Sequence, residues 1–229
     1  MDMGYQYLLF DLDGTLTDPK EGITKCFRYA LESFGIHEPD ADKLTWVIGP
    51  PLAESFMEGY GFTLEQAGQG TAKYRERFTL VGWKENKAYP GIARTLRALK
   101  EAGFVLATAT SKPEDMAKRI LDHFGLAEYF AFIGGASLDL SRSKKRDVIQ
   151  YTLDNLGVKD FGKVLMVGDR KYDVEGAKEF KIPCLGVLYG YGSREELLQA
   201  GAVALVEDTE SLCEWCMEHR EKSILRGRI

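Results

Sequence analysis

Six short apolar runs recur along the chain, and turn residues bound each of them. The runs cover residues 5–10, 104–109, 129–133, 164–167, 183–188 and 203–206. Several are nearly continuous rather than alternating in polarity, which is typical of parallel strands covered on both faces. Between them lie helical patterns at 92–102, 113–124, 145–156, 173–180, 194–200 and 211–219. This alternation predicts an α/β protein with a doubly wound parallel sheet.

One interval, between the first apolar run and the helix expected at residue 92, breaks this alternation. We expect no strand in it over roughly eighty residues, far more than a strand–helix–strand crossover needs. Helical patterns fill it at 20–34, 40–47, 52–59 and 64–81, and a turn-rich segment at 86–91 leads back to the sheet. The pattern therefore predicts a core domain of residues 1–15 and 86–229 with an inserted helical cap of residues 16–85.

The composition is that of an ordinary globular protein. Of the 229 residues, 45% are hydrophobic and 28% are charged, which argues against a disordered or collagen-like chain. The net charge of -5 provides no basic surface for nucleic acid. The basic residues of segment 222–229 are expected to belong to a solvated chain end. No stretch is long and apolar enough to span a membrane, so we expect no membrane association.

The N-terminus and the cysteines favour a cytoplasmic location. Residues 1–6 contain an acidic residue and lack the basic segment of a signal peptide. Without such a signal, no disulfides are expected from the four cysteines, which are Cys26, Cys184, Cys213 and Cys216. Cys213 and Cys216 form a C-x-x-C in a predicted terminal helix. Since no second pair accompanies them, packing is a more economical role than redox chemistry or zinc binding.

The strongest chemical signal follows the first apolar run, in the segment F-D-L-D-G-T-L-T at residues 10–17. The carboxyl ends of strands face the ligand crevice of an open α/β sheet. The two-residue period places Asp11 and Asp13 on one side if the strand continues that far. Carboxylates so close repel each other, so either a cation lies between them or one holds a proton. One can then act as a nucleophile while the other moves protons. The alternative is an acidic turn, since Asp and Gly are common at strand ends.

The segment D-L-D-G-T-L that begins at Asp11 resembles the first motif, D-x-D-G-T-[LV], of the haloacid dehalogenase-like hydrolase superfamily, and the resemblance extends along the chain. It identifies Thr110 and Ser111 as the second motif, which implies that this hydroxyl and the following amide bind phosphate oxygens at a helix entrance. Alone, that segment also fits an ordinary helix cap. The third motif, R-x-x-K-x-x-[VI], matches with Lys145 in preference to Lys144. It implies an ammonium that neutralises the nucleophile and the phosphate.

The segment G-D-R-K-Y-D at residues 168–173 matches the fourth motif, G-D-x-x-x-D. The resemblance implies that Mg²⁺ is held by the carboxylates of Asp11 and Asp169 and by the backbone carbonyl of Asp13. Asp173 would orient these groups or a metal-bound water from behind, and it also fits as an N-cap of the next helix. Oxygen ligands favour Mg²⁺ over zinc, and no cluster of histidines and cysteines competes.

The helical insert resembles the C1 cap of subfamily IA, in the branch of phosphoglycolate phosphatases and 5'-nucleotidase-like proteins. The resemblance implies a phosphatase for a small phosphomonoester. Asp11 would attack phosphorus to form an aspartyl-phosphate, and Asp13 would protonate the leaving oxygen and then deprotonate water. A dehalogenase lacks the second Asp, so Asp13 argues against that activity. A phosphomutase of the β-phosphoglucomutase type is an alternative. A non-catalytic phosphate-binding module is a more remote alternative. We expect a monomer or weak homodimer, without nucleic acid or membrane partners.

Three parts of the chain are candidates for contacts with the substrate outside the four motifs. Lys20, Glu21 and Arg28 follow the first connection to the cap. The segment W-V-I-G-P-P-L at 46–52 resembles the substrate-facing loop of such caps and equally fits a turn between helices. The segment G-Y-G at 190–192 resembles one that shapes the rim of the site. Caps of this kind exclude water and provide specificity contacts, so the identity of the substrate depends on residues that form no readable motif.

Overall fold

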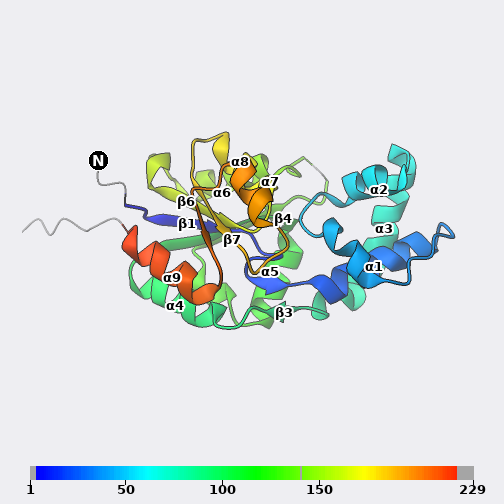
Figure 1. Ribbon diagram of the computed structural model, residues 1–229, viewed down its shortest axis with the longest axis horizontal. Helices are drawn as coiled ribbons and strands as arrows, with labels where there is room; N and C mark the ends of the chain where they lie inside the picture. The colour runs from blue at the N-terminus through cyan, green and yellow to red at the C-terminus, as the bar shows by residue number, and fades with distance from the viewer. Residues whose placement is uncertain (1–3, 140, 221–229) are drawn as a thin grey trace, which may run out of the picture.

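The computed structural model describes residues 4–139 and 141–220, and its centre is a six-stranded parallel sheet (Figure 1). In spatial order the strands are β5 (Phe132–Ala136), β4 (Val105–Pro113), β1 (Tyr7–Phe10), β6 (Val164–Gly168), β7 (Cys184–Val187) and β8 (Ala204–Val206). Every neighbouring pair is parallel. Strands that follow β1 in the sequence lie on both sides of it in the sheet. The predicted doubly wound parallel sheet is therefore confirmed.

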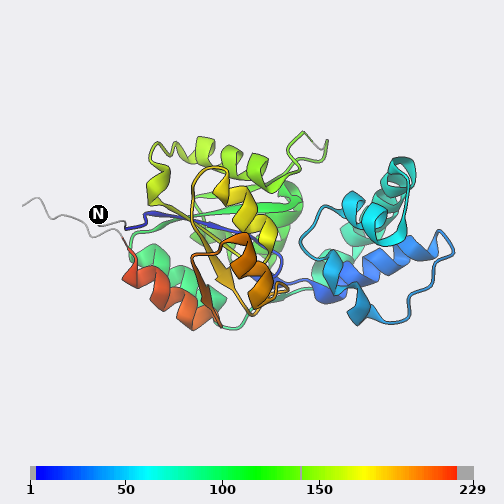
Figure 2. The same ribbon diagram turned by 45° about the horizontal axis from the view of Figure 1, so that its top comes forward.

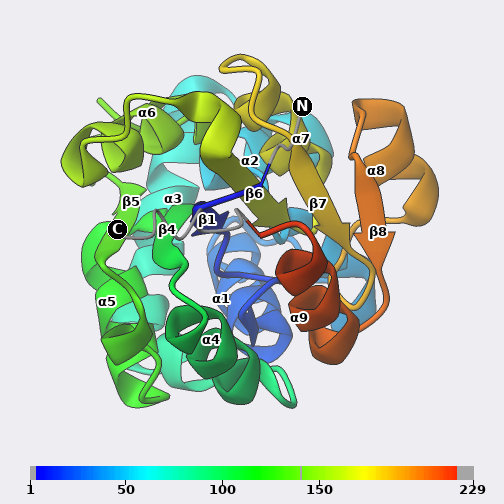
Figure 3. The same cartoon turned by 90° about the vertical axis from the view of Figure 1, so that its left-hand side faces the viewer.

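Helices cover both faces of the sheet (Figure 3). One face carries α4 (Ile92–Glu101), α5 (Glu114–His123) and α9 (Thr209–Glu218), and the other carries α6 (Lys145–Leu156), α7 (Lys171–Lys178) and α8 (Arg194–Ala200). In β1, Leu8 and Phe10 belong to one hydrophobic cluster and Leu9 to the other, and all three are fully buried. Burial on both faces explains why this strand is apolar at successive positions.

A group of helices lies beside the sheet, at the end toward which β1 points (Figures 1 and 2). It comprises α1 (Lys20–Glu32), the 3-10 helix η1 (Ala41–Val47), α2 (Leu52–Tyr60) and α3 (Leu64–Leu80). Its interior is aromatic: the ring centroids of Phe27 and Phe56 lie 4.3 Å apart, and those of Phe56 and Phe62 lie 5.5 Å apart. The helical group therefore has an apolar centre next to the carboxyl ends of the strands. The domain limits at residues 15 and 85 stay a prediction.

A short antiparallel ribbon joins the helical group to the sheet. Strand β2 (Thr17–Asp18) pairs with β3 (Lys87–Ala88), with Thr17 opposite Ala88. The expectation of no strand in this interval was therefore wrong, because two-residue strands are too short to show a period in the sequence. The chain leaves and re-enters the sheet domain along this ribbon, so the two connections run side by side as a hinge would require.

Two predicted boundaries shift where glycine or proline lies inside a strand. Strand β5 begins later than predicted because Ala127–Tyr129 forms a 3-10 helix (η3), and it continues through Gly134. A Cβ atom at Gly134 would lie 2.1 Å from Thr152 Oγ1, so only glycine permits α6 to pack so closely there. Strand β4 runs on to Pro113 after a register shift beyond Thr110, and α5 begins only after it.

Three expectations from the sequence concern regions away from the carboxyl ends of the strands. Among the described residues, no helix has the length and apolar character that crossing a membrane requires. The basic segment 222–229 lies outside the described residues. All four cysteines are free, and Cys216 is fully buried on α9, in agreement with a packing role for that residue.

Candidate active site

Three aspartates converge at the carboxyl ends of two neighbouring strands. Asp11 follows β1, Asp169 follows β6, and Asp173 lies in the first turn of α7. The Asp11 N–H donates a hydrogen bond of 2.9 Å to the Val167 carbonyl, so the ladder between β1 and β6 carries Asp11 to the edge of the sheet. One carboxylate oxygen of each aspartate lies within 4.8 Å of the others, and all three residues are buried. The structure thus brings these three site candidates together, and their roles stay predictions.

Lys145, the first residue of α6, is the cation of this cluster. Its Nζ lies 2.9 Å from Asp11 Oδ1 and 2.8 Å from Asp173 Oδ1, and it donates a hydrogen bond of 3.0 Å to the Ala109 carbonyl. Its side chain is 6% exposed. Lys144, one residue earlier, is exposed. Of the two lysines that the sequence offered, Lys145 is the one that reaches Asp11.

The cluster contains more negative than positive charge. Burial raises the pKa of Asp169 well above its ordinary value, and the neighbouring Asp173 and Asp11 raise it further. Burial also raises the pKa of Asp173, although Lys145 opposes this. For Lys145, burial lowers the pKa, but Asp11 and Asp173 outweigh it, so the ammonium stays charged. Three carboxylates around one ammonium fit a divalent cation, and carboxylate oxygens are the ligands that Mg²⁺ prefers.

Asp13 lies apart from the three clustered aspartates and has its own cation. Strand β1 ends at Phe10, so the two-residue period that was expected to align Asp11 and Asp13 does not continue; the chain turns at Gly14, where φ is 84°. Lys112 donates to Asp13 Oδ2, whereas Asp13 Oδ1 is buried with no hydrogen-bond partner among the described residues. Burial raises the pKa of Asp13, Lys112 lowers it and Asp11 raises it. A carboxyl group of this kind, with one oxygen free, can exchange a proton with a ligand.

The segment at 190–192 does more than form a rim, because it packs directly on Asp169. The Tyr191 N–H donates a hydrogen bond of 2.8 Å to Asp169 Oδ2. A Cβ atom at Gly192 would lie 1.9 Å from the Asp169 carbonyl oxygen, and one at Gly14 would lie 2.1 Å from Asp169 Oδ2. The tyrosine hydroxyl also donates to Asp18 Oδ1 in the hinge ribbon. The Asp169 carboxylate is therefore held by backbone that only glycine allows to come so near.

Thr110 and Ser111 lie on the neighbouring strand β4. Thr110 is 1% exposed, and its Oγ1 accepts a hydrogen bond of 3.2 Å from the Lys112 N–H. Ser111 is half-buried and lines a pocket together with Lys145. The helix predicted from residue 113 begins at Glu114, directly after β4 ends at Pro113, so Ser111 lies in the strand just before the helix entrance. No motif in the sequence pointed to Lys112, because its contact with Asp13 depends on the direction of its side chain.

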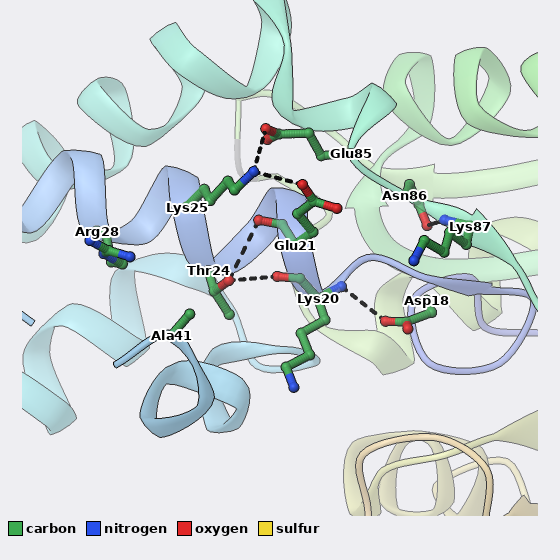
Figure 4. Close-up of a pocket in the computed structure, with 10 residues that line it drawn as sticks. All are labelled: Asp18, Lys20, Glu21, Thr24, Lys25, Arg28, Ala41, Glu85, Asn86 and Lys87. Atoms are coloured by element: carbon green, nitrogen blue, oxygen red, sulfur yellow. Dashed lines mark hydrogen bonds and ion pairs between the residues drawn. The ribbon is translucent and has the colours of Figure 1, made fainter. Parts of the chain in front are cut away.

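Lys20, Glu21 and Arg28 line a pocket of about 230 Å³ at the hinge, where their side chains point in different directions (Figure 4). Asp18 and Lys87 of the hinge ribbon also line it, and no member of the aspartate cluster does. Several of the charges satisfy one another: Lys20 pairs with Asp42 at 2.8 Å, and Lys25 pairs with Glu21 at 2.6 Å. The structure therefore brings these three candidates together with each other rather than with Asp11.

The loop at 46–52 faces the sheet domain. Gly49 and Pro51 line a second pocket, whose opposite wall includes Ser111, Lys145 and Tyr172. Trp46 packs edge-on against Phe27, with ring centroids 6.3 Å apart. The segment is thus a connection between helices that lines a pocket shared with Ser111 and Lys145. The turn between helices is confirmed, and a role facing the substrate stays a prediction.

Comparison with known proteins identifies relatives over most of the chain. Residues 8–187 match the family model described as haloacid dehalogenase-like hydrolase. The 5'-nucleotidase of Pseudomonas aeruginosa is 45% identical over 84% of this chain and 87% of its own length. The tyrosine-protein kinase PtkA of Mycobacterium tuberculosis is 43% identical over 82% of this chain, which spans 63% of that protein. The phosphoglycolate phosphatase of Aquifex aeolicus is 34% identical over 80% of this chain and 85% of its own length.

A solved structure shares the whole arrangement. The crystal structure of a predicted phosphatase from Clostridium acetobutylicum superposes with a TM-score of 0.91 at 48% identity, and the match covers 93% of this chain and 99% of that one. At this coverage the sheet and the helical group recur together. The fold seen here is therefore one that a related sequence adopts in a crystal.

Proposed function

The chain belongs to the haloacid dehalogenase-like hydrolase family and is a phosphatase, and on this premise we propose that it hydrolyses a small phosphomonoester with Mg²⁺ through an aspartyl-phosphate on Asp11. The observation that carries the proposal is the buried contact of Lys145 with both Asp11 and Asp173 inside the aspartate cluster. A cation beside a carboxylate that must approach a phosphate lowers the repulsion between two anions. An acidic turn at a strand end would have no need of such a partner.

In the proposed reaction a carboxylate oxygen of Asp11 bonds to phosphorus while the bond to the leaving oxygen breaks. Asp13 transfers a proton to that oxygen, and later accepts one from the water that hydrolyses the aspartyl-phosphate, so the enzyme returns to its starting state. Thr110, Ser111 and Lys145 hold the phosphoryl oxygens. Asp11, Asp169 and the Asp13 carbonyl would hold Mg²⁺, with Asp173 behind them, and the bound cation would supply positive charge to the phosphoryl group.

The proposed substrate is a phosphoglycolate-like or 5'-nucleotide-like phosphomonoester. Its support is the names of two relatives, a 5'-nucleotidase and a phosphoglycolate phosphatase, together with a pocket in which Gly49 and Pro51 of the helical group face Ser111 and Lys145. An alcohol in place of water would accept the phosphoryl group from the same intermediate, as in a phosphomutase. Transfer to a tyrosine hydroxyl, which the name of the relative PtkA describes, is a further outcome of the same kind. We also propose that the protein is cytoplasmic, as a monomer or weak homodimer.

The test measures phosphate release from 5'-nucleotides, phosphoglycolate, sugar phosphates and p-nitrophenyl phosphate, with Mg²⁺ and after chelation by EDTA. Asp11→Asn keeps the shape of the side chain but removes the nucleophile, so we expect at least about a 10³-fold loss. The matched control is Asp154→Asn, an exposed aspartate on α6, which should keep full activity. Full activity of Asp11→Asn, or activity that EDTA does not reduce, contradicts the proposal. Formation of a sugar phosphate isomer without free phosphate would identify a mutase instead.

A further inference from the structure

Arg170 connects the aspartate cluster to the helical group. It directly follows Asp169, and its backbone N–H donates a hydrogen bond of 3.1 Å to Asp173 Oδ2. Its side chain leaves the cluster and reaches the loop after η1, where Nη1 donates to the Ile48 carbonyl. One residue thus touches the predicted metal site through its backbone and the predicted cap through its guanidinium.

The loop is shaped to admit this side chain. Gly49 has a φ of 111°, a backbone conformation that side chains disfavour. A Cβ atom there would lie 3.0 Å from Arg170 Cγ and 3.3 Å from its Nη1. The arginine therefore packs against a residue without a side chain and bonds to the preceding carbonyl. The contact depends on loop backbone rather than on a side chain of the helical group.

The guanidinium is held in place from the side of the sheet domain. Its Nε lies 2.9 Å from Glu196 Oε1, and the Lys171 N–H donates to the same oxygen at 2.9 Å. Glu196 lies in the first turn of α8, where the Ser193 hydroxyl accepts a hydrogen bond from its N–H. The Arg170 side chain is 11% exposed. An arginine fixed in this way loses little freedom when it binds a further acceptor, which favours a positioning role.

The loop that Arg170 holds lines a pocket together with two of the predicted phosphate-binding residues. Gly49 and Pro51 line the same pocket as Ser111 and Lys145. Resting on the function proposed above, we propose that Arg170 is a positioning residue that holds the segment 48–51 over the bound substrate. A leaving group large enough to contact the segment 48–51 then depends on Arg170 for its binding. The binding of the phosphoryl group does not depend on Arg170.

The test compares substrates whose leaving groups differ in size. In Arg170→Met, which removes the guanidinium and keeps an unbranched stem, we expect kcat/KM for 5'-AMP to fall about tenfold, the loss typical of one hydrogen bond to a charged group. Most of that change should appear in KM. For phosphoglycolate and acetyl phosphate, whose leaving groups are small, we expect less than a threefold change. Glu196→Gln, which loosens the guanidinium without removing it, should give a smaller loss with the same substrate pattern.

The matched control is Arg194→Met on the same helix α8 as Glu196. Arg194 forms an exposed ion pair of 2.6 Å with Glu207 and should leave all three substrates unaffected. Equal losses on all three substrates in Arg170→Met, or no loss on any, would overturn the proposal. If Arg170→Met fails to fold, unchanged kinetics in Glu196→Gln would overturn the proposal.

A measurement without turnover separates this proposal from the proposed function. Small-angle X-ray scattering of the full chain without added ligand should give a larger radius of gyration for Arg170→Met than for the wild type and Arg194→Met. Identical radii would overturn the role of Arg170 even if the enzyme is active. If the wild type releases no phosphate from any substrate, the proposed function fails while the scattering comparison still decides the position of the loop.

Discussion

Replacement of Lys145 by methionine tests the charge balance of the candidate site. Methionine fills a similar volume but leaves Asp11 and Asp173 without the ammonium that lies 2.9 and 2.8 Å from them. The side chain of Asp173 is 1% exposed, so water cannot take the place of the lost cation. Without added metal, the variant therefore buries three neighbouring carboxylates that have no compensating charge.

The expected effect on stability is large. Removing one partner of a buried ion pair costs about 3–5 kcal/mol of the free energy of unfolding. A domain of this kind has about 5–15 kcal/mol in total, so the variant should still fold. Removing the competing cation should also strengthen Mg²⁺ binding, and a ligand at one hundred times its Kd adds about 2.7 kcal/mol. We therefore expect Mg²⁺ to stabilise Lys145→Met more than the wild type. Turnover should fall about 10²–10³-fold because one electrostatic contact to the phosphoryl group is lost.

Urea unfolding followed by tryptophan fluorescence, in EDTA and in Mg²⁺, measures the stability difference, and phosphate release measures turnover. The control is Lys144→Met, the neighbouring exposed lysine, which should change the free energy of unfolding by less than about 0.5 kcal/mol. The reasoning is refuted if the two variants are equally stable in EDTA. It is also refuted if Mg²⁺ stabilises Lys145→Met no more than the wild type.

Two further substitutions test other parts of the site. Gly14→Ala should lower the affinity for Mg²⁺, measured by calorimetric titration, because its Cβ atom would lie 2.1 Å from Asp169 Oδ2. The control is Gly35→Ala, which has a similar positive φ but open space around it. This control should lower the free energy of unfolding by only about 1–2 kcal/mol, the cost of that backbone conformation. Lys112→Met should destabilise the fold by about 3 kcal/mol in urea unfolding, because Asp13 loses the partner of its buried carboxylate. Unchanged Mg²⁺ binding in the first variant, or unchanged stability in the second, would contradict these contacts.

The central strands were predictable because burial on both faces leaves a continuous apolar run, as in β1 and β6. The bounds of β5 were not predictable, because Gly134 gives no strand signal. Glycine is required there because α6 packs closely against it, and only the tertiary structure contains that contact. The hinge ribbon was missed for a different reason. Two residues in each strand carry no period, and their pairing joins Thr17 to Ala88, far along the chain.

The aspartate cluster could be anticipated because each member lies in a short local motif and the sheet order makes those motifs neighbours. Asp11 and Asp169 end strands that pair directly, and Lys145 opens the helix that packs beside them. The partner of Asp13 could not be derived in this way. Lys112 reaches it from the other neighbouring strand through a side-chain contact over 99 positions of the sequence, and Arg170 reaches Ile48 over 122. Such contacts depend on side-chain direction, which the pattern of polar and apolar positions does not contain.

The charges explain why the predicted metal site and the predicted phosphoryl site would lie at the same place. Asp11, Asp169 and Asp173 around Lys145 leave an excess of two negative charges when all four are ionised. A phosphate dianion would be repelled by such a cluster. The pKa of Asp169 is raised first by burial and then by the neighbouring Asp173 and Asp11, which is the same repulsion among the carboxylates themselves. One divalent cation would cancel the excess, so an anionic substrate would then meet a neutral site with a charged lysine beside the predicted nucleophile. Cation binding should therefore precede productive substrate binding, and a monovalent cation of similar size should not replace it.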